Sequence, residues 1–129
     1  MKRSMIAFLM VLATTLSARA EEAAPAAADE FKIKGDAAKG AETYKMYCAT
    51  CHGETGKGDG VGAAALNPKP RDFTDKAIMA TIPDSEVFKA IKEGGAAVGK
   101  SPMMIAWGML LKEDQQIHDV AAYVRSLGQ

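Results

Sequence analysis

Two cysteines and a histidine stand within five consecutive residues of this chain, which reads "CATCH" from Cys48 to His52. Cys48 and Cys51 are the only cysteines, and His52 is one of two histidines. A Cys-x-x-Cys pair can form a disulfide, supply zinc ligands, act as a thiol redox centre or attach a haem covalently. The rest of the sequence has to discriminate among these four kinds of chemistry.

Three of these chemistries leave part of the cluster unexplained. Zinc normally takes four ligands, and a set completed by the other histidine, His118, would require adjacent Cys51 and His52 to reach one tetrahedral ion. A thioredoxin-type pair follows a β-strand, and no stretch of this chain alternates convincingly as a strand. A disulfide would close a very short loop and give His52 no role. All three remain as weaker alternatives.

Haem attachment uses all three side chains. The thiols of Cys48 and Cys51 can add across the two vinyl groups of a porphyrin as thioethers, and the adjacent His52 imidazole is then carried under the iron as an axial ligand. Cys-x-x-Cys-His is the attachment signature of c-type haem. The sequence therefore predicts one covalent haem c, with Cys48 and Cys51 as attachment residues and His52 as an iron ligand.

Residues 1–20 have the pattern of a signal peptide. Lys2 and Arg3 precede the apolar stretch 5–16, and Ala18-Arg19-Ala20 gives the small-x-small pattern of a cleavage site. The apolar stretch is too short for a bilayer, which needs roughly 20 residues, although a retained anchor is the alternative. We expect cleavage near Ala20, export to the periplasm and no stable membrane insertion afterwards.

Cleavage would also change the charge of the chain. The full sequence has a net charge of zero, and removal of Lys2, Arg3 and Arg19 leaves acidic residues in excess. A mildly acidic protein is poorly suited to nucleic acid, whose phosphates favour a basic surface. We therefore expect no nucleic-acid partner.

Two further parts follow the expected cleavage site. Residues 21–30, "EEAAPAAADE", contain alanine, proline and acids with no large side chain to bury, which predicts a flexible linker. Residues 31–129 form the expected domain. It has few aromatic side chains for a core, and small domains often need an added stabiliser such as a metal or disulfides. A large apolar cofactor would supply that bulk.

Apolar residues recur at helical spacing in three segments of this domain. These segments are about 36–47, about 84–93 and about 113–127. The connections between them are rich in glycine and proline, as in "GETGKGDGVG" and "NPKPRD". The sequence therefore predicts an all-α domain with long loops.

A six-coordinate haem iron needs a second axial ligand from this chain. The candidates are Met46, Met79, Met103, Met104, Met109 and His118. The stretch "GKSPMMIAWG" is placed best, because Pro102 and the flanking glycines indicate an irregular loop that can wrap the open haem face. Consecutive extended residues point in opposite directions, so only one of Met103 and Met104 can bind the iron.

These motifs resemble class I c-type cytochromes, specifically the small bacterial monohaem proteins related to cytochrome c6 and to the haem domains of cbb3-type oxidases. The resemblance covers nearly all of residues 36–127. It is carried by "GAETYKMYCATCHGETGKGDG", "LNPKPRDFTD" and "SPMMIAWG" followed by "VAAYVRSL". The family's Met-Pro-Ala-Trp aligns with residues 104–107, with Ile105 in place of proline. The resemblance thus implies Met104 as the axial ligand, with Met103 as second choice.

The resemblance implies the cytochrome c fold, with three to five helices packed around one covalent haem. It also implies haem contacts for Arg71 and Trp107, both toward a propionate, and a backbone carbonyl near residues 66–70 as the partner of His52 Nδ1. The implied function is a periplasmic, monomeric, non-enzymatic electron carrier that docks transiently on redox proteins. The alternatives are a haem sensor or enzyme with a labile sixth ligand, or a haem subunit of a larger complex.

Overall fold

The computed structural model describes residues 30–129, and the regular elements in that range are all helices. In chain order they are α1 (Ala37–Tyr47), α2 (Ala49–His52), the 3-10 helix η1 (Val61–Ala65), α3 (Lys76–Ala80), α4 (Asp84–Glu93), the 3-10 helix η2 (Gly95–Val98) and α5 (Asp114–Leu127). The all-α prediction is confirmed. The predicted signal peptide 1–20 and residues 21–29 of the predicted linker lie outside the described residues. Within 30–129, no helix has the length and apolar character to cross a bilayer.

The three helices predicted from apolar spacing correspond to α1, α4 and α5. Asp36 is the N-cap of α1, where its side chain accepts hydrogen bonds from the backbone N–H groups of Ala38 and Lys39. These hydrogen bonds supply an acceptor to backbone N–H groups of the first turn, which have no acceptor within the helix. α4 has the predicted bounds and ends at Gly94, which adopts a φ of 88°. Glu113 is the N-cap of α5, one residue before the helix begins.

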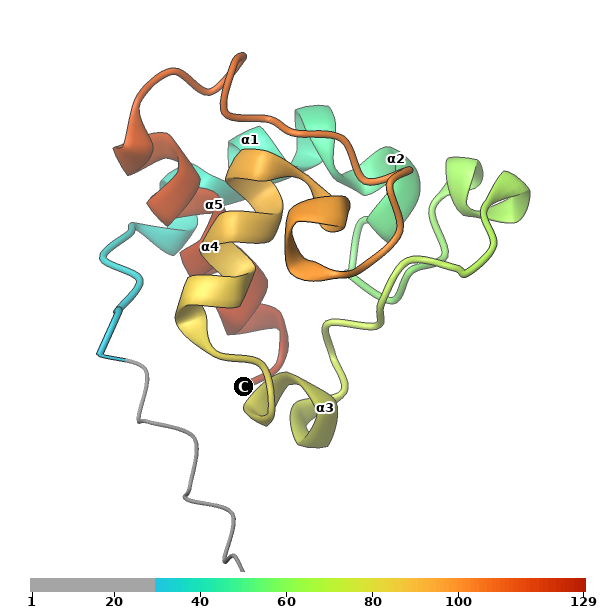
Figure 1. Cartoon of the computed structure of the whole chain (residues 1–129). Coiled ribbons are helices and arrows are strands. Elements are labelled where there is room, and N and C mark those ends of the chain that lie inside the picture. Colours follow the sequence, from blue (N-terminus) through green and yellow to red (C-terminus); the bar gives the residue numbers. More distant parts are fainter. Residues whose placement is uncertain (1–29) are drawn as a thin grey trace, which may run out of the picture.

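Two glycines pack directly on the backbone of α5: Gly40 in α1, and Gly35 in the segment that precedes α1. A Cβ atom on Gly40 would lie 1.9 Å from the backbone oxygen of Asp119, and one on Gly35 would lie 2.0 Å from that of His118. Such contacts are sterically impossible, so glycine at position 40 lets α1 approach α5 closely, and glycine at position 35 does the same for the segment before α1. Figure 1 shows the crossing of these helices, with α4 beside α5.

The hydrophobic core lies between α1, α4 and α5 and extends to α3. Its buried members are Tyr44, Met79, Val87, Ile91, Leu111, Ile117, Val120, Ala121 and Val124. Met79 comes from α3 and is 5% exposed, so this methionine is core packing. Cys48, Met104 and Trp107 are partly buried against the same core. The predicted haem-binding residues therefore border the core.

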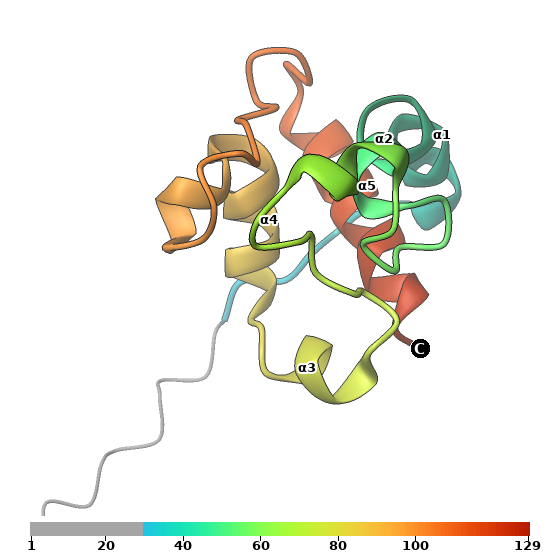
Figure 2. The ribbon, with the colours of Figure 1, turned by 90° about the vertical axis from the view of Figure 1, so that its right-hand side faces the viewer.

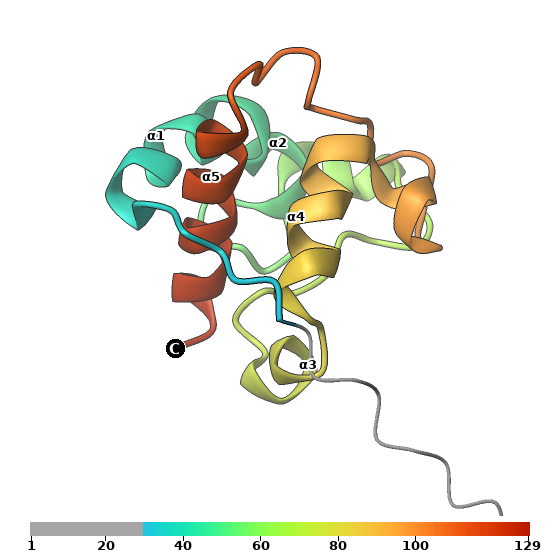
Figure 3. The same ribbon diagram turned by 60° about the vertical axis from the view of Figure 1, so that its left-hand side comes forward.

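The segment 31–36 runs across α4 and α5, as Figure 3 shows. Three of its backbone N–H groups donate to side chains of these helices: Ile33 to Asp84 (3.1 Å), Lys34 to His118 Nδ1 (3.2 Å) and Asp36 to Asp119 (2.8 Å). These bonds join residues more than 50 positions apart and fix the start of the domain on its own helices.

Arg125 connects α5 to the beginning of α4. Its guanidinium donates to Asp84 Oδ1 at 2.9 Å, to the Met79 carbonyl at 2.8 Å and to the Ile82 carbonyl. Both charged side chains are largely buried, and three acceptors occupy one planar donor group, which makes this a better-defined contact than a surface ion pair. It holds the α3–α4 connection against α5.

Candidate haem site

The attachment motif begins where α1 ends. Cys48 is the C-cap of α1 and the residue before α2, and α2 contains Cys51 and His52. The backbone N–H of His52 donates to the Cys48 carbonyl at 2.9 Å. α2 ends at Gly53, which has a φ of 81° and leaves room for the Asp59 carboxylate, 2.1 Å from where a Cβ would be. The chain can therefore turn sharply straight after His52.

Cys48 and Cys51 are free thiols that lie three residues, or about one helical turn, apart. Both residues are partly exposed. Burial, and secondarily the neighbouring Cys51, raises the pKa of the Cys48 thiol to about 12. Cys48 is thus an uncharged thiol at neutral pH, unlike the low-pKa nucleophile of a thiol redox centre.

The His52 ring is held in an apolar setting. It stacks on Phe73 with ring centroids 4.7 Å apart and planes 17° from parallel. Burial lowers the pKa of His52 to about 4, and the Arg71 backbone opposes this shift in part. The imidazole is therefore neutral at physiological pH, as an iron ligand has to be.

One polar atom of the His52 ring has no partner. Nδ1 is the one buried side-chain nitrogen or oxygen in residues 30–129 that lacks a hydrogen bond. The sequence predicted that a carbonyl near residues 66–70 would accept its proton. The structure differs: Arg71, one residue further, is the group whose backbone acts on the ring, and it does so outside hydrogen-bond geometry. The Pro70 carbonyl instead faces Gly58.

Met103 and Met104 differ clearly in their surroundings. Met103 is 63% exposed, whereas Met104 is half-buried and packs against the core. The two residues lie in a turn rather than in an extended stretch, and they differ in exposure as expected. Of the two, Met104 is the methionine whose side chain faces the interior of the domain.

The loop that carries these methionines is fixed to α4 by backbone hydrogen bonds. The Met104 carbonyl accepts from Gly95 N–H at 2.8 Å, and Trp107 N–H donates to the Ile91 carbonyl at 3.0 Å. Gly108 N–H donates to the Lys92 carbonyl at 3.0 Å. The last carbonyls of a helix have no partner within it, and here the loop supplies two of the missing donors. Figure 2 shows this loop on α4 and the segment after α2 in front of it.

Arg71 and Trp107, the two predicted propionate contacts, lie on different loops. Arg71 is half-buried and forms no ion pair with a carboxylate of residues 30–129. Trp107 is half-buried, and its ring packs on Tyr47 with centroids 5.5 Å apart. The structure brings Trp107 to the carboxyl end of α1, one residue before Cys48. Their roles toward haem remain predictions.

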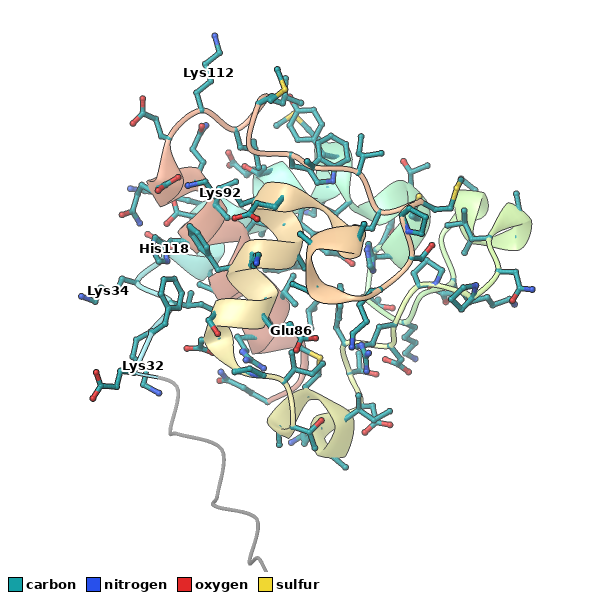
Figure 4. The ribbon with its side chains drawn as sticks, viewed as in Figure 1. Lys32, Lys34, Glu86, Lys92, Lys112 and His118 are labelled. Atoms are coloured by element: carbon teal, nitrogen blue, oxygen red, sulfur yellow. The ribbon has the colours of Figure 1, made fainter. Side chains whose placement is uncertain are left out.

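The other ligand candidates lie elsewhere. The His118 ring lies between Phe31 (5.6 Å) and Phe88 (4.6 Å), and its Nδ1 accepts from Lys34. Figure 4 shows His118 on the side of Lys34 and Lys92, away from α2. Met46 and Met109 are 64% and 90% exposed.

The donor set fits a haem. Within residues 30–129 no three His, Cys, Asp or Glu side chains converge as ligands of one metal ion. Two free thiols one helical turn apart, a neutral imidazole beside them and an inward-facing thioether are the groups that c-type attachment and axial ligation use. Sequence reasoning missed the hydrogen bond of the Tyr44 hydroxyl and the ring contact of Phe73, because both depend on distances that a sequence does not give.

Comparison with known proteins decides the family. A family model described as cytochrome c matches residues 37–128. The chain belongs to the cytochrome c family. Membership of the family indicates haem-based electron transfer and implies a covalently bound haem c, as predicted. The cbb3-type cytochrome c oxidase subunit FixP of Bradyrhizobium diazoefficiens is 35% identical to this cytochrome c over 94 residues, 72% of this chain and 28% of FixP. The chain thus spans little more than a quarter of that relative.

Solved structures agree with this assignment. A chain of the Kuenenia stuttgartiensis reducing HAO-like protein complex Kustc0457/Kustc0458 is 31% identical with a TM-score of 0.57, and the match covers 75% of this cytochrome c and 45% of that chain. The KustC0563 c-type cytochrome is 24% identical with a TM-score of 0.57, over 70% of this chain and 98% of that one, which supports the fold. The predicted cytochrome c fold is confirmed.

Proposed function

We propose that this cytochrome c is an exported periplasmic electron carrier with one haem c, attached through Cys48 and Cys51 and ligated by His52 and Met104. The observation that carries the proposal is the pairing of a neutral, stacked His52 with a half-buried Met104 whose neighbour Met103 is exposed. When bound, the haem supplies a one-electron change between Fe(II) and Fe(III).

The residues of this chain have three tasks in that role. His52 and Met104 would hold the iron of a bound haem, which would leave no site for gases or substrates and suit the protein to carry electrons rather than to catalyse a reaction. The core residues and the half-buried Trp107 keep water from the attachment region. The loop that carries Met104 presents exposed apolar side chains, Met103, Ile105, Met109 and Leu110, for brief docking on redox proteins. Weak redox encounters use small interfaces of this kind.

The proposal is tested on the exported, purified full chain by intact mass, visible spectrum and exposure to carbon monoxide. We expect the mass of the chain without residues 1–20 plus one haem, and a reduced spectrum that carbon monoxide does not change. The matched control, Cys48→Ala/Cys51→Ala, should lack the added mass. A parent chain without haem mass would refute the proposal, and rapid carbon monoxide binding would favour a sensor or enzyme with a labile sixth ligand.

A second candidate is a haem subunit of a larger oxidoreductase. It is favoured by the relatives, because FixP is an oxidase subunit and the Kuenenia chain belongs to a protein complex. Gel filtration of the periplasmic extract separates the two candidates. A free carrier elutes as a monomer, while a subunit co-elutes with a larger assembly in fixed proportion.

A further inference from the structure

We propose that Phe73 is a positioning residue that sets the plane of the His52 imidazole. The inference rests on the proposed function, in which His52 is an axial ligand, and assigns the control of that ligand to a ring from a distant loop. An axial imidazole normally has its orientation fixed by a hydrogen bond at its other nitrogen. In this protein the Arg71 backbone acts on the His52 ring, but Nδ1 has no hydrogen bond of normal geometry, and the stacked Phe73 ring is a second group placed to control the orientation of the imidazole.

The contact with Phe73 has the geometry for this task. The two rings are 17° from parallel at a centroid separation of 4.7 Å. Rotation of the imidazole about its bond to the rest of the side chain would drive its edge into the Phe73 face, because stacked rings at this separation are in van der Waals contact. The other histidine gives a comparison: Phe88 lies 4.6 Å from His118 but is tilted by 41°, while the His118 Nδ1 has its hydrogen bond.

The glycine-rich loop after α2 holds Phe73 in this place. Phe73 N–H donates to the Gly56 carbonyl at 2.7 Å, and Gly58 N–H donates to the His52 carbonyl at 2.8 Å. The backbone of His52 and the backbone of Phe73 are therefore bonded to the same short loop. The stack does not depend on side-chain packing alone.

Glycine at position 58 lets these two loops meet, because a Cβ there would lie 2.2 Å from the Pro70 carbonyl oxygen. Gly58 has a φ of 72° and Gly56 a φ of 79°. The positive φ angles favour glycine independently of this contact. "GETGKGDG" thus has a structural purpose, which is to bring residues 70–73 under the axial histidine.

The test compares Phe73→Leu with Phe88→Leu in the haem-loaded full chain. Both changes remove a half-buried ring that packs on a histidine, so both should lower the melting temperature. Phe73→Leu alone should also change the spread of the haem-methyl proton shifts of the oxidised protein, which depends on the plane of the axial imidazole, and shift the reduction potential. Phe73→Trp, which keeps a flat apolar face, should retain the haem-methyl pattern of the parent.

The outcomes separate this proposal from the proposed function. If Phe73→Leu keeps the haem-methyl pattern and potential of the parent while losing stability as Phe88→Leu does, Phe73 is packing only and the proposal is wrong. Absence of haem from the parent would instead refute the proposed function. Should Phe73→Leu fail to accumulate, the parent decides: nuclear Overhauser contacts between the Phe73 and His52 rings in the reduced protein support the proposal, and their absence overturns it.

Discussion

The hydroxyl of Tyr44 donates a hydrogen bond to the carbonyl of Gly53 at 2.9 Å in the buried core. Tyr44 belongs to α1, and Gly53 directly follows the last residue of α2, His52. The bond therefore joins α1 to the end of α2, and both cysteines lie between the two bonded residues in the sequence. The Gly53 carbonyl also accepts from Gly56 N–H at 3.2 Å, whereas the Tyr44 hydroxyl depends on Gly53 for its partner, so the bond favours one position of the tyrosine in the core.

Tyr44→Phe should lower the free energy of unfolding by about 0.5–1.5 kcal/mol, the net contribution of one hydrogen bond, because the Gly53 carbonyl keeps the Gly56 N–H as a donor. Denaturant unfolding of the haem-loaded protein measures this. Tyr123→Phe is the matched control: its ring packs on Tyr44 with centroids 5.0 Å apart, and its hydroxyl has no hydrogen bond to residues 30–129. Equal stability losses in the two variants would contradict the importance of the Tyr44 bond.

Alkaline pH should act on the same residue. Burial first, and then nearby Cys48, Tyr123 and Asp59, raise the pKa of Tyr44 above its usual value near 10. The folded state therefore retains a proton that the unfolded chain releases above about pH 10, so this contribution to stability is complete below that pH and is lost as pH rises. We expect stability to fall more steeply above pH 10 in the parent than in Tyr44→Phe, as measured by denaturant midpoints. Parallel curves would show that Tyr44 does not contribute.

Replacement of each loop methionine by histidine should distinguish them. Met104→His should lower the reduction potential, because a second imidazole replaces the softer thioether. Met103→His should leave the potential and the visible spectrum of the parent unchanged, since that side chain is 63% exposed. Spectroelectrochemical titration of both variants beside the parent makes the measurement, and the reverse result would move the ligand assignment to Met103.

Gly40→Ala should destabilise the fold by about 1–3 kcal/mol, the usual cost of overpacking. The added Cβ would lie 1.9 Å from the Asp119 carbonyl oxygen, so α1 and α5 have to separate. Lys39→Ala, at the exposed neighbouring position, should stay within about 0.5 kcal/mol of the parent. Thermal unfolding followed by circular dichroism compares the two, and a tolerated Gly40→Ala would mean that the helices can shift apart freely.

Ile105→Glu should slow oxidation of the reduced cytochrome by bacterial membranes roughly tenfold, equivalent to about 1.4 kcal/mol. Ile105 is 58% exposed on the loop proposed to dock, and a carboxylate there would have to lose water at the interface. Ile78→Glu adds the same charge on α3, which Figure 1 places at the other end of the domain. Stopped-flow rates that fall equally in both variants would point to net charge instead of a docking site.

The sequence predicted helices best where apolar residues recur at helical spacing, and site residues best where the residue types have a distinctive chemistry. α4 has its predicted bounds because Val87 and Ile91 mark one face and Gly94 ends the helix. The five-residue α3 was missed, since a segment so short shows no period, although Asp75 caps it through Ile78 N–H.

The candidate site likewise contains residues that the sequence predicts and residues that only the structure identifies. Cys48, Cys51 and His52 have a spacing that only one chemistry uses fully, and so the sequence alone predicts them as haem-binding residues. Phe73 was not found, because a phenylalanine has no recognisable chemistry until its distance to a histidine is known. The approach of Arg71 to the His52 ring also depends on how two loops meet, which residue type does not encode.

The bonds between the carboxyl end of α4 and the loop that carries Met104 couple two events that are usually separate. Since the Ile91 and Lys92 carbonyls are capped by Trp107 and Gly108, the final turn of α4 cannot fray while the loop stays in place. If Met104 ligates the iron as proposed, a backbone movement of this loop that withdrew the sulfur would also free the end of α4, so the two changes would form one cooperative opening. A closed and a gas-accessible form would then exchange in an all-or-none manner.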